Sequence, residues 1–258
     1  MTETLNRPAV EQPPRFGQLF SRIVFAGLIA GVLAGVYSLL VTERTITPAL
    51  DLEEARAAAE GGHEHVEELF TRPEQLLGGF LGTVLAGLVL AVVFATVYGL
   101  VRHRLPGRTD VGRTALLAAI GFGVMALVPA LKIPANPPAV GDPETVGLRT
   151  AIYGGVLLCG IVGAVLVAAL IGWLRRRGTG DATTAIAATV AAAALLTLVL
   201  VLVPDNPDTV AADVPTSVVW NFRLASLGQL AVLWAGLGLT SGWLLDRLTR
   251  RRRSVATA

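Results

Sequence analysis

Long runs of apolar residues separated by short polar segments dominate this chain. Six runs are long enough for a helix to cross the hydrocarbon core of a bilayer, which takes about 20 residues. They cover residues 20–41, 76–101, 114–131, 151–174, 184–203 and 224–246. The runs are rich in Gly, Ala, Leu and Val and hold almost no charge, so their backbone groups must be satisfied within helices and not within a barrel of alternating strands. The pattern predicts an all-α integral membrane protein, a bundle of about six transmembrane helices.

A weak internal repeat runs through the second, fourth and sixth apolar runs. Each ends in glycine followed by an arginine cluster, in YGLVRHR, IGWLRRR and GWLLDRLTRR, at intervals of about 70 residues. This spacing suggests three parallel hairpins, and internal repeats of this general kind are frequent in transporters. The alternative is that these helices end with Gly and Arg only for packing and topology.

Composition supports the membrane assignment and charge sets the orientation. The chain is 53% hydrophobic and only 16% charged, against about 25% charged residues in soluble domains. Of its 21 basic residues, 15 lie in or within three residues of the two tails and the second and fourth loops, whereas the other three loops hold 14 of the 19 acidic residues. Because cationic loops resist translocation, both termini are expected in the cytoplasm of a multi-pass plasma-membrane protein.

These boundaries divide the chain into three parts. Residues 1–19 form a cytoplasmic tail, 20–248 the membrane domain and 249–258 a basic cytoplasmic tail. The net charge of +2 hides a dipolar arrangement of charge, so the arginines predict membrane anchoring and no binding of nucleic acid. No phosphate-binding GxxxxGK[ST] loop is present, so ATP-driven transport would need a nucleotide site on another polypeptide. No nucleophile–base pair or metal-ligand triad falls within the helices, so an enzyme is not expected.

The outer loop between the first two runs contains GGHEHVEE. His63 and His65 point the same way in an extended chain, and on a helix His63 pairs with Glu67 four residues on. Imidazole suits Zn, Cu, Ni and related divalent ions, and the carboxylates of Glu64 and Glu67 would add neutralising charge. The loop is therefore a candidate for capturing a divalent metal ion, although a solvated acidic surface is the simpler alternative.

The third loop, LKIPANPPAVGDPETVGLRT, is stiffened by four prolines. It places oxygen donors on Asn136, Asp142 and Glu144 near the outer ends of the third and fourth helices. An ordinary proline-rich turn would explain the same residues.

The start of the last helix, VPTSVVWNFRLASLGQ, carries a further polar group. Trp220 fits an interfacial aromatic belt, and Arg223 is costly in a membrane unless it is paired or near the surface. Asp142 or Glu144 is the expected partner of Arg223, with snorkelling of Arg223 to the interface as the alternative. Arg149 and Arg223 would then hold these carboxylates in place.

The histidine-bearing loop, the block LKIPANPPAVGDPETVGLRT and the closing VPTSVVWNFRLASLGQLAVLW together resemble the CbtA family of predicted cobalt transporter subunits, over residues 18–248. The resemblance implies cobalt uptake linked to cobalamin supply, beside a small partner, CbtB, with one span and its own histidines. This chain departs from the family in two respects. Members often have longer histidine runs than HEH, and five spans are commonly described where the charge pattern here requires an even number.

The sequence therefore predicts a permease subunit for a divalent transition metal, most simply Co²⁺, with Ni²⁺ or Zn²⁺ as other substrates and no permanently bound cofactor. Membrane-interior ligands are scarce, so a partner subunit or a homo-oligomer is expected to complete the pathway. Two alternatives remain at this stage: a non-transporting scaffold that binds a partner protein, and a permease for an organic solute such as a corrinoid.

Overall fold

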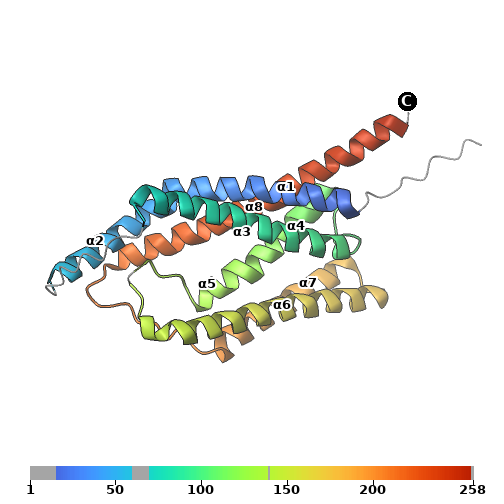
Figure 1. The fold of residues 1–258 in the computed structure, drawn as a ribbon. Coiled ribbons are helices and arrows are strands. Elements are labelled where there is room, and N and C mark those ends of the chain that lie inside the picture. The colour runs from blue at the N-terminus through green and yellow to red at the C-terminus, as the bar shows by residue number, and fades with distance from the viewer. Residues whose placement is uncertain (1–15, 60–69, 139, 257–258) are drawn as a thin grey trace, which may run out of the picture.

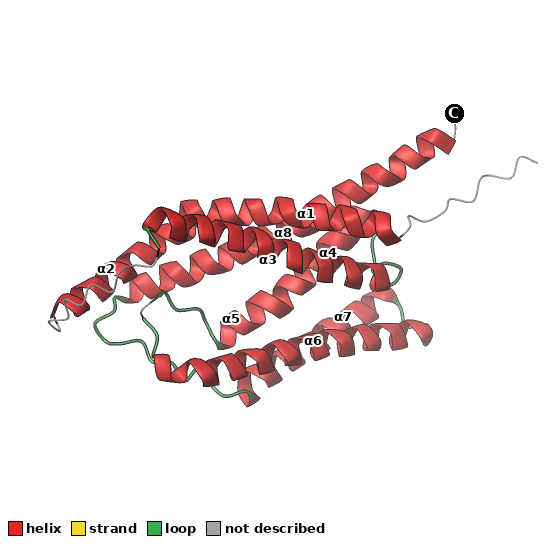
Figure 2. Ribbon diagram, in the orientation of Figure 1, coloured by secondary structure: helices red, strands yellow, loops and turns green. Residues whose placement is uncertain are grey.

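The computed structural model describes residues 16–59, 70–138 and 140–256, and every regular element within them is a helix (Figure 2). The elements in chain order are α1 (Phe16–Tyr37), η1 (Ser38–Thr42), α2 (Glu43–Ala59), α3 (Arg72–Val101), α4 (Asp110–Phe122), η2 (Gly123–Leu127), α5 (Val128–Lys132), η3 (Pro143–Thr145), α6 (Val146–Arg176), α7 (Asp181–Leu202) and α8 (Thr216–Ala256).

Six helical spans in these residues are long and apolar enough to cross a membrane. The first joins α1, the π-helical turn η1 and α2, and the third joins α4, the π-helical turn η2 and α5. The prediction of an all-α membrane protein with six spans is therefore confirmed. One segment differs from the expectation, because residues 43–59, expected to belong to the outer loop, continue the first helix as α2 even though Pro48 lies within it.

The core of the bundle is built by α1, α3, α4 and α8. Helix α1 packs against α3 and α8, and α8 packs against α4 (Figure 1). Small residues allow the close approach of α1 and α3, since a Cβ on Gly31 would lie 2.8 Å from the Cα of Val84. Between α8 and α4, the ring of Trp234 on α8 packs into the space left by Gly121 on α4, and it lies edge-on to Phe94 on α3.

Helices α6 and α7 form a hairpin outside this core. They pack against each other and reach the rest of the bundle through α5 and η2 (Figure 1). No residue in the most apolar window of α7 is buried, and 11% of the corresponding window of α6 is buried. The repeat suggested that the fifth and sixth spans, α7 and α8, form the third hairpin. In the structure α7 packs on α6, whereas α8 packs on α1 and α4.

The two ends of the bundle differ in charge. Helix α1 begins and α8 ends at the same end (Figure 1), where the arginines of the 102–113, 175–177 and 247–250 segments also lie; we call this the basic end. The opposite end, which we call the acidic end, is formed by α2 and by the segments 133–142 and 203–215. An even number of spans follows from this placement.

Two exposed tryptophans lie toward opposite ends of the bundle on α8. Trp220 near the acidic end is 55% exposed and Trp243 near the basic end is 48% exposed. At 1.5 Å per residue they lie about 34 Å apart along the helix, close to the thickness of a bilayer core. An arginine lies near each ring, Arg223 at 6.0 Å and Arg247 at 4.0 Å from the ring centroid, as expected for a belt at the polar headgroups.

Candidate functional site

The acidic end contains a buried polar network centred on Asp208. The carboxylate of Asp208 is fully buried. Its Oδ2 accepts hydrogen bonds from the Asn136 side-chain amide at 2.7 Å and from Arg149 at 2.5 Å, and its Oδ1 accepts from the backbone N–H of Asp142 at 2.8 Å. These three donors satisfy both oxygens of the Asp208 carboxylate.

These contacts join three parts of the chain. Arg149 belongs to α6, Asp208 to the segment between α7 and α8, and Asn136 and Asp142 to the proline-rich segment after α5. Arg149 also donates to the backbone carbonyl of Asp142 at 3.4 Å. The prolines of the two segments remove backbone donors and keep the chain extended, so side chains and isolated N–H groups make the links between them.

Arg223 adds the last helix to this network, but not through the expected carboxylate. Its Nη2 donates to Asn136 Oδ1 at 2.7 Å and its Nε to the carbonyl of Ala135 at 3.1 Å. The expected ion pair between Arg223 and Asp142 or Glu144 is therefore replaced by contacts to an amide and a carbonyl. Asn136 uses both ends of its amide, donating to Asp208 and accepting from Arg223.

The carboxylates of Asp142 and Glu144 play smaller parts in this arrangement. Asp142 Oδ1 accepts from the backbone N–H of Glu144 at 2.9 Å, which caps the short turn η3 before α6. Glu144 is exposed on that turn. Trp220 is exposed on α8, and its place in an interfacial belt stays a prediction.

Two further ion pairs surround the network. Lys132, which is 8% exposed, donates to Asp205 Oδ1 at 2.5 Å and to the carbonyl of Leu200 at 2.9 Å. On the surface, Arg56 of α2 donates to Asp213 Oδ2 through Nε at 2.9 Å and Nη2 at 2.7 Å, and these hydrogen bonds lower the pKa of Asp213. Helix α2 is thereby attached to the 203–215 segment.

The proposed metal-capture residues His63, Glu64, His65 and Glu67 lie outside the described residues. The helices on either side of them, α2 and α3, end and begin at the acidic end (Figure 1). Within the described part of the chain, no three His, Cys, Asp or Glu side chains gather as a metal site.

A second polar cluster lies inside the membrane span, where α8 meets α1 and α3. Gln229 Oε1 accepts from the hydroxyl of Thr42 at 3.0 Å, and its Nε2 donates to the hydroxyl of Thr83 at 3.4 Å. Thr42 is buried and is the last residue of the π-helical turn η1. π-Helical turns within α-helices occur frequently at functional sites.

Sequence reasoning missed Asp208 and the partners of Gln229. The stretch VPDNPDTVAADVP around Asp208 has the same Asn-Pro and Asp-Pro turn chemistry as the proline-rich third loop, and an even number of spans puts both at one end. That shared position, together with the need of Arg149 and Arg223 for an anionic partner, could have indicated Asp208 as a partner. No local pattern relates Gln229 to Thr42 or Thr83.

The fold and its charge distribution define a multi-pass helical membrane protein with polar groups at its acidic end and within one helix junction. The family model for the probable cobalt transporter subunit (CbtA) matches residues 16–246. The chain belongs to this family, as the resemblance predicted. No curated protein and no solved structure matches it.

Proposed function

We propose that the chain forms the membrane pathway of a cobalt uptake system, with the acidic end outside the cell and the basic end in the cytoplasm. The family description indicates cobalt as the substrate, and the separation of acidic and basic residues supports transport from the acidic end to the basic end. Carboxylates at an entrance raise the local concentration of cations, whereas arginines at an exit disfavour their return. Cytoplasmic arginine clusters also agree with the usual topology of membrane proteins.

The observation that carries this proposal is the cluster of Gln229, Thr42 and Thr83. Along α8, Gln229 lies about 13 Å from Trp220 and about 21 Å from Trp243, so we place it in the outer half of the span. Polar groups at this depth are costly and usually mark a substrate path. Transporters commonly bind their substrates near the midplane, at irregular helices such as the one formed here by η1.

The chemistry of this cluster suits passage of a divalent ion. Its amide and hydroxyl oxygens are neutral, hard donors, which accept a hydrated Co²⁺ without the tight binding that a thiolate or a set of histidines would produce. A pathway needs sites that are favourable enough to enter and weak enough to leave. The hydrogen bonds that now join the three side chains would open to admit the ion.

We further propose that the outer loop and a partner complete the system. His63 and His65, with Glu64 and Glu67, would collect the metal ion ahead of the entrance lined by Asn136, Asp142 and Glu144. The family description names a subunit, which implies a partner. The wide unburied faces of α6 and α7 offer room for a one-span partner of the CbtB kind, or for a second copy of the chain, within the bilayer.

The test is uptake of radioactive Co²⁺ by cells without another cobalt importer that express the chain alone or with a CbtB-like partner. We expect Gln229→Leu to lower the maximal rate at least about tenfold, which corresponds to roughly 1.4 kcal/mol of lost interaction in the rate-limiting step. Thr42→Ser should retain uptake and Thr42→Val should not. Thr96→Val is the matched control, because the Thr96 hydroxyl bonds to the Val92 carbonyl within its own helix.

Protein abundance in the membrane fraction separates lost transport from lost folding. Gln229→Glu keeps the shape of the side chain and adds a charge, so we expect it to lower both the half-saturating Co²⁺ concentration and the maximal rate. If the wild type took up no Co²⁺, either alone or with the CbtB-like partner, the cobalt function would be refuted. Normal uptake by Gln229→Leu and Gln229→Glu would instead refute the pathway through this cluster.

A further inference from the structure

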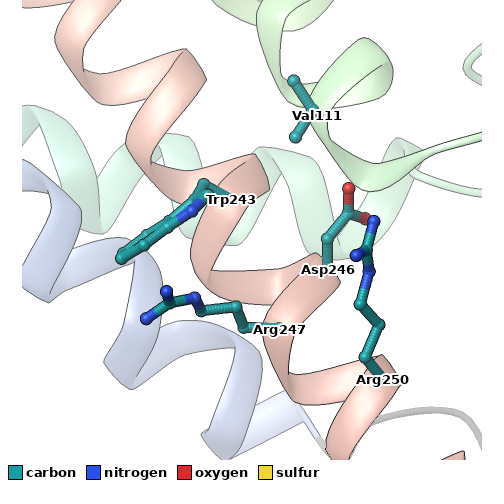
Figure 3. Close-up of a pocket in the computed structure, with 5 residues that line it drawn as sticks. All are labelled: Val111, Trp243, Asp246, Arg247 and Arg250. Atoms are coloured by element: carbon teal, nitrogen blue, oxygen red, sulfur yellow. The ribbon is translucent and has the colours of Figure 1, made fainter.

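Two adjoining cavities open at the basic end, between α8 and the start of α4. One has a volume of about 380 Å³ and is lined by Val111, Trp243, Asp246, Arg247 and Arg250 (Figure 3). The other has a volume of about 320 Å³, shares Asp246 and Arg250 with the first, and adds Arg108, Thr109, Asp110, Arg113 and Thr249 to its walls. These cavities lie far from the network around Asp208 and from the Gln229 cluster.

The arginines around these cavities lack carboxylate partners. All four ion pairs in the described part of the chain involve Arg56, Arg72, Lys132 or Arg149, which belong to the acidic half of the bundle. Arg113 donates instead to the carbonyl of Gly107 at 3.1 Å. The cavities therefore hold a surplus of positive charge, with four arginines facing two carboxylates.

The two carboxylates are already engaged in holding the helices together. Asp110 Oδ1 accepts from the hydroxyl of Tyr98 at 2.8 Å, and Asp246 Oδ1 accepts from the backbone N–H of Asp110 at 3.0 Å. These contacts tie α3, α4 and α8 at one point. Figure 3 shows the Arg250 guanidinium beside the Asp246 carboxylate, while the Arg247 guanidinium lies over the ring of Trp243.

The depth of the cavities matches the headgroup layer of a bilayer. Trp243 belongs to the belt at this end, and the guanidinium of Arg247 stacks on its ring at 4.0 Å. Val111 and Trp243 give the first cavity an apolar wall beside its charged groups, as Figure 3 shows. A ligand that fits both cavities has a phosphate for the arginines and an apolar part that remains in the membrane.

We infer that these cavities bind the phosphate headgroup of an anionic phospholipid of the adjacent leaflet. Basic pockets between transmembrane helices commonly recognise such headgroups. The arginines would contact the phosphate oxygens, with the hydroxyls of Thr109 and Thr249 on the same cavity wall. A bound lipid would hold α4 and α8 together at the end where their arginines otherwise repel each other.

The test compares thermal unfolding of the detergent-purified chain with added phosphatidylglycerol, phosphatidylcholine, glycerol 3-phosphate or inorganic phosphate. We expect only phosphatidylglycerol to raise the unfolding midpoint of the wild type. The doubly substituted Arg108→Gln, Arg250→Gln chain should lose about 2–4 °C of this rise for each arginine removed. The control, Arg175→Gln with Arg177→Gln, removes the same charge at the same end outside the cavities and should keep the rise.

If the control lost as much of the phosphatidylglycerol-induced rise in the unfolding midpoint, the proposed site would be overturned, because the stabilisation would then depend on overall charge. An equal rise with inorganic phosphate would overturn the lipid as the ligand. Native mass spectrometry of the wild type gives a second measurement that needs no variant. At equal concentrations, retained phosphatidylglycerol should exceed retained phosphatidylcholine, and equal retention would contradict the inference.

Discussion

Removing the Asp208 carboxylate should destabilise the protein more than any other change of a carboxylate at the acidic end. Asp208→Ala leaves the Asn136 amide, the Arg149 guanidinium and the Asp142 N–H without their acceptor, at a position where the native carboxylate is fully buried. Breaking a fully buried ion pair costs about 3–5 kcal/mol. The side chain of Arg149 retains 23% exposure, so its charge regains some hydration and the lower figure of about 3 kcal/mol applies.

The assay is thermal unfolding of the purified protein in detergent, followed by the fluorescence of its four tryptophans. A loss of about 3 kcal/mol should lower the midpoint by roughly 6–12 °C in a chain of this size. Asp213→Ala is the matched control in the same segment, because the Asp213 side chain is 59% exposed and its ion pair with Arg56 is on the surface. We expect this control to change the midpoint little.

A double substitution separates the ion pair from general damage to the loop. Arg149→Met combined with Asp208→Ala removes both charges, so its cost should be smaller than the sum of the two single costs. Additive costs, or a midpoint for Asp208→Ala equal to that of Asp213→Ala, would refute the assignment of Asp208 as the centre of the network.

Two predictions concern the membrane and the metal ion. A reporter fused after Gly178 and one fused at the end of α8 should both read as cytoplasmic, while one between α7 and α8 should read as external; an external reading after Gly178 would contradict the six-span arrangement. Replacing His63 and His65 with alanine should lower Co²⁺ accumulation mainly at low external concentration, since a capture site raises local supply without forming the pathway. Uptake unchanged at every concentration would show that these histidines are only part of a solvated loop.

The spans and the charged ends were predictable because both depend on local properties. Twenty apolar residues must form a helix in a bilayer wherever they occur in the chain, and arginine clusters set the orientation loop by loop. The same reasoning predicts an interfacial position for Trp220. None of these inferences requires knowledge of which helices touch.

Helix α2 shows where local reasoning fails. Its sequence is polar and contains Pro48, both of which favour a loop. It is helical because it continues α1 and because Ala49 and Leu52 pack against Val140 and Val214 of the two segments at the acidic end and against Val219 of α8. Those contacts join residues far apart in the chain, so no pattern within residues 43–59 reveals them.

The partners of Arg223 and Arg149 were misjudged for a related reason. A carboxylate was sought in the proline-rich segment itself, and the true acceptors are the Asn136 amide and the carboxylate of Asp208, the latter more than 50 residues after Arg149. Charge alone predicts that an arginine in a membrane needs a partner. Which partner it finds depends on how the ends of α6, α7 and α8 meet.

The position of the network around Asp208 follows from the weakness of apolar packing in lipid. Because lipid tails are as apolar as leucine, helices in a bilayer associate through close packing of small residues and through polar contacts. Helices α1 and α3 associate through close packing of small residues, at Gly31. The hairpin of α6 and α7 buries little surface against the core and uses polar contacts, since Arg149 binds Asp208 and Asn136 connects Asp208 to Arg223 of α8. The network thus links the hairpin to the core at the acidic end, where a movement of α6 would be transmitted directly to α8, the helix that carries Gln229.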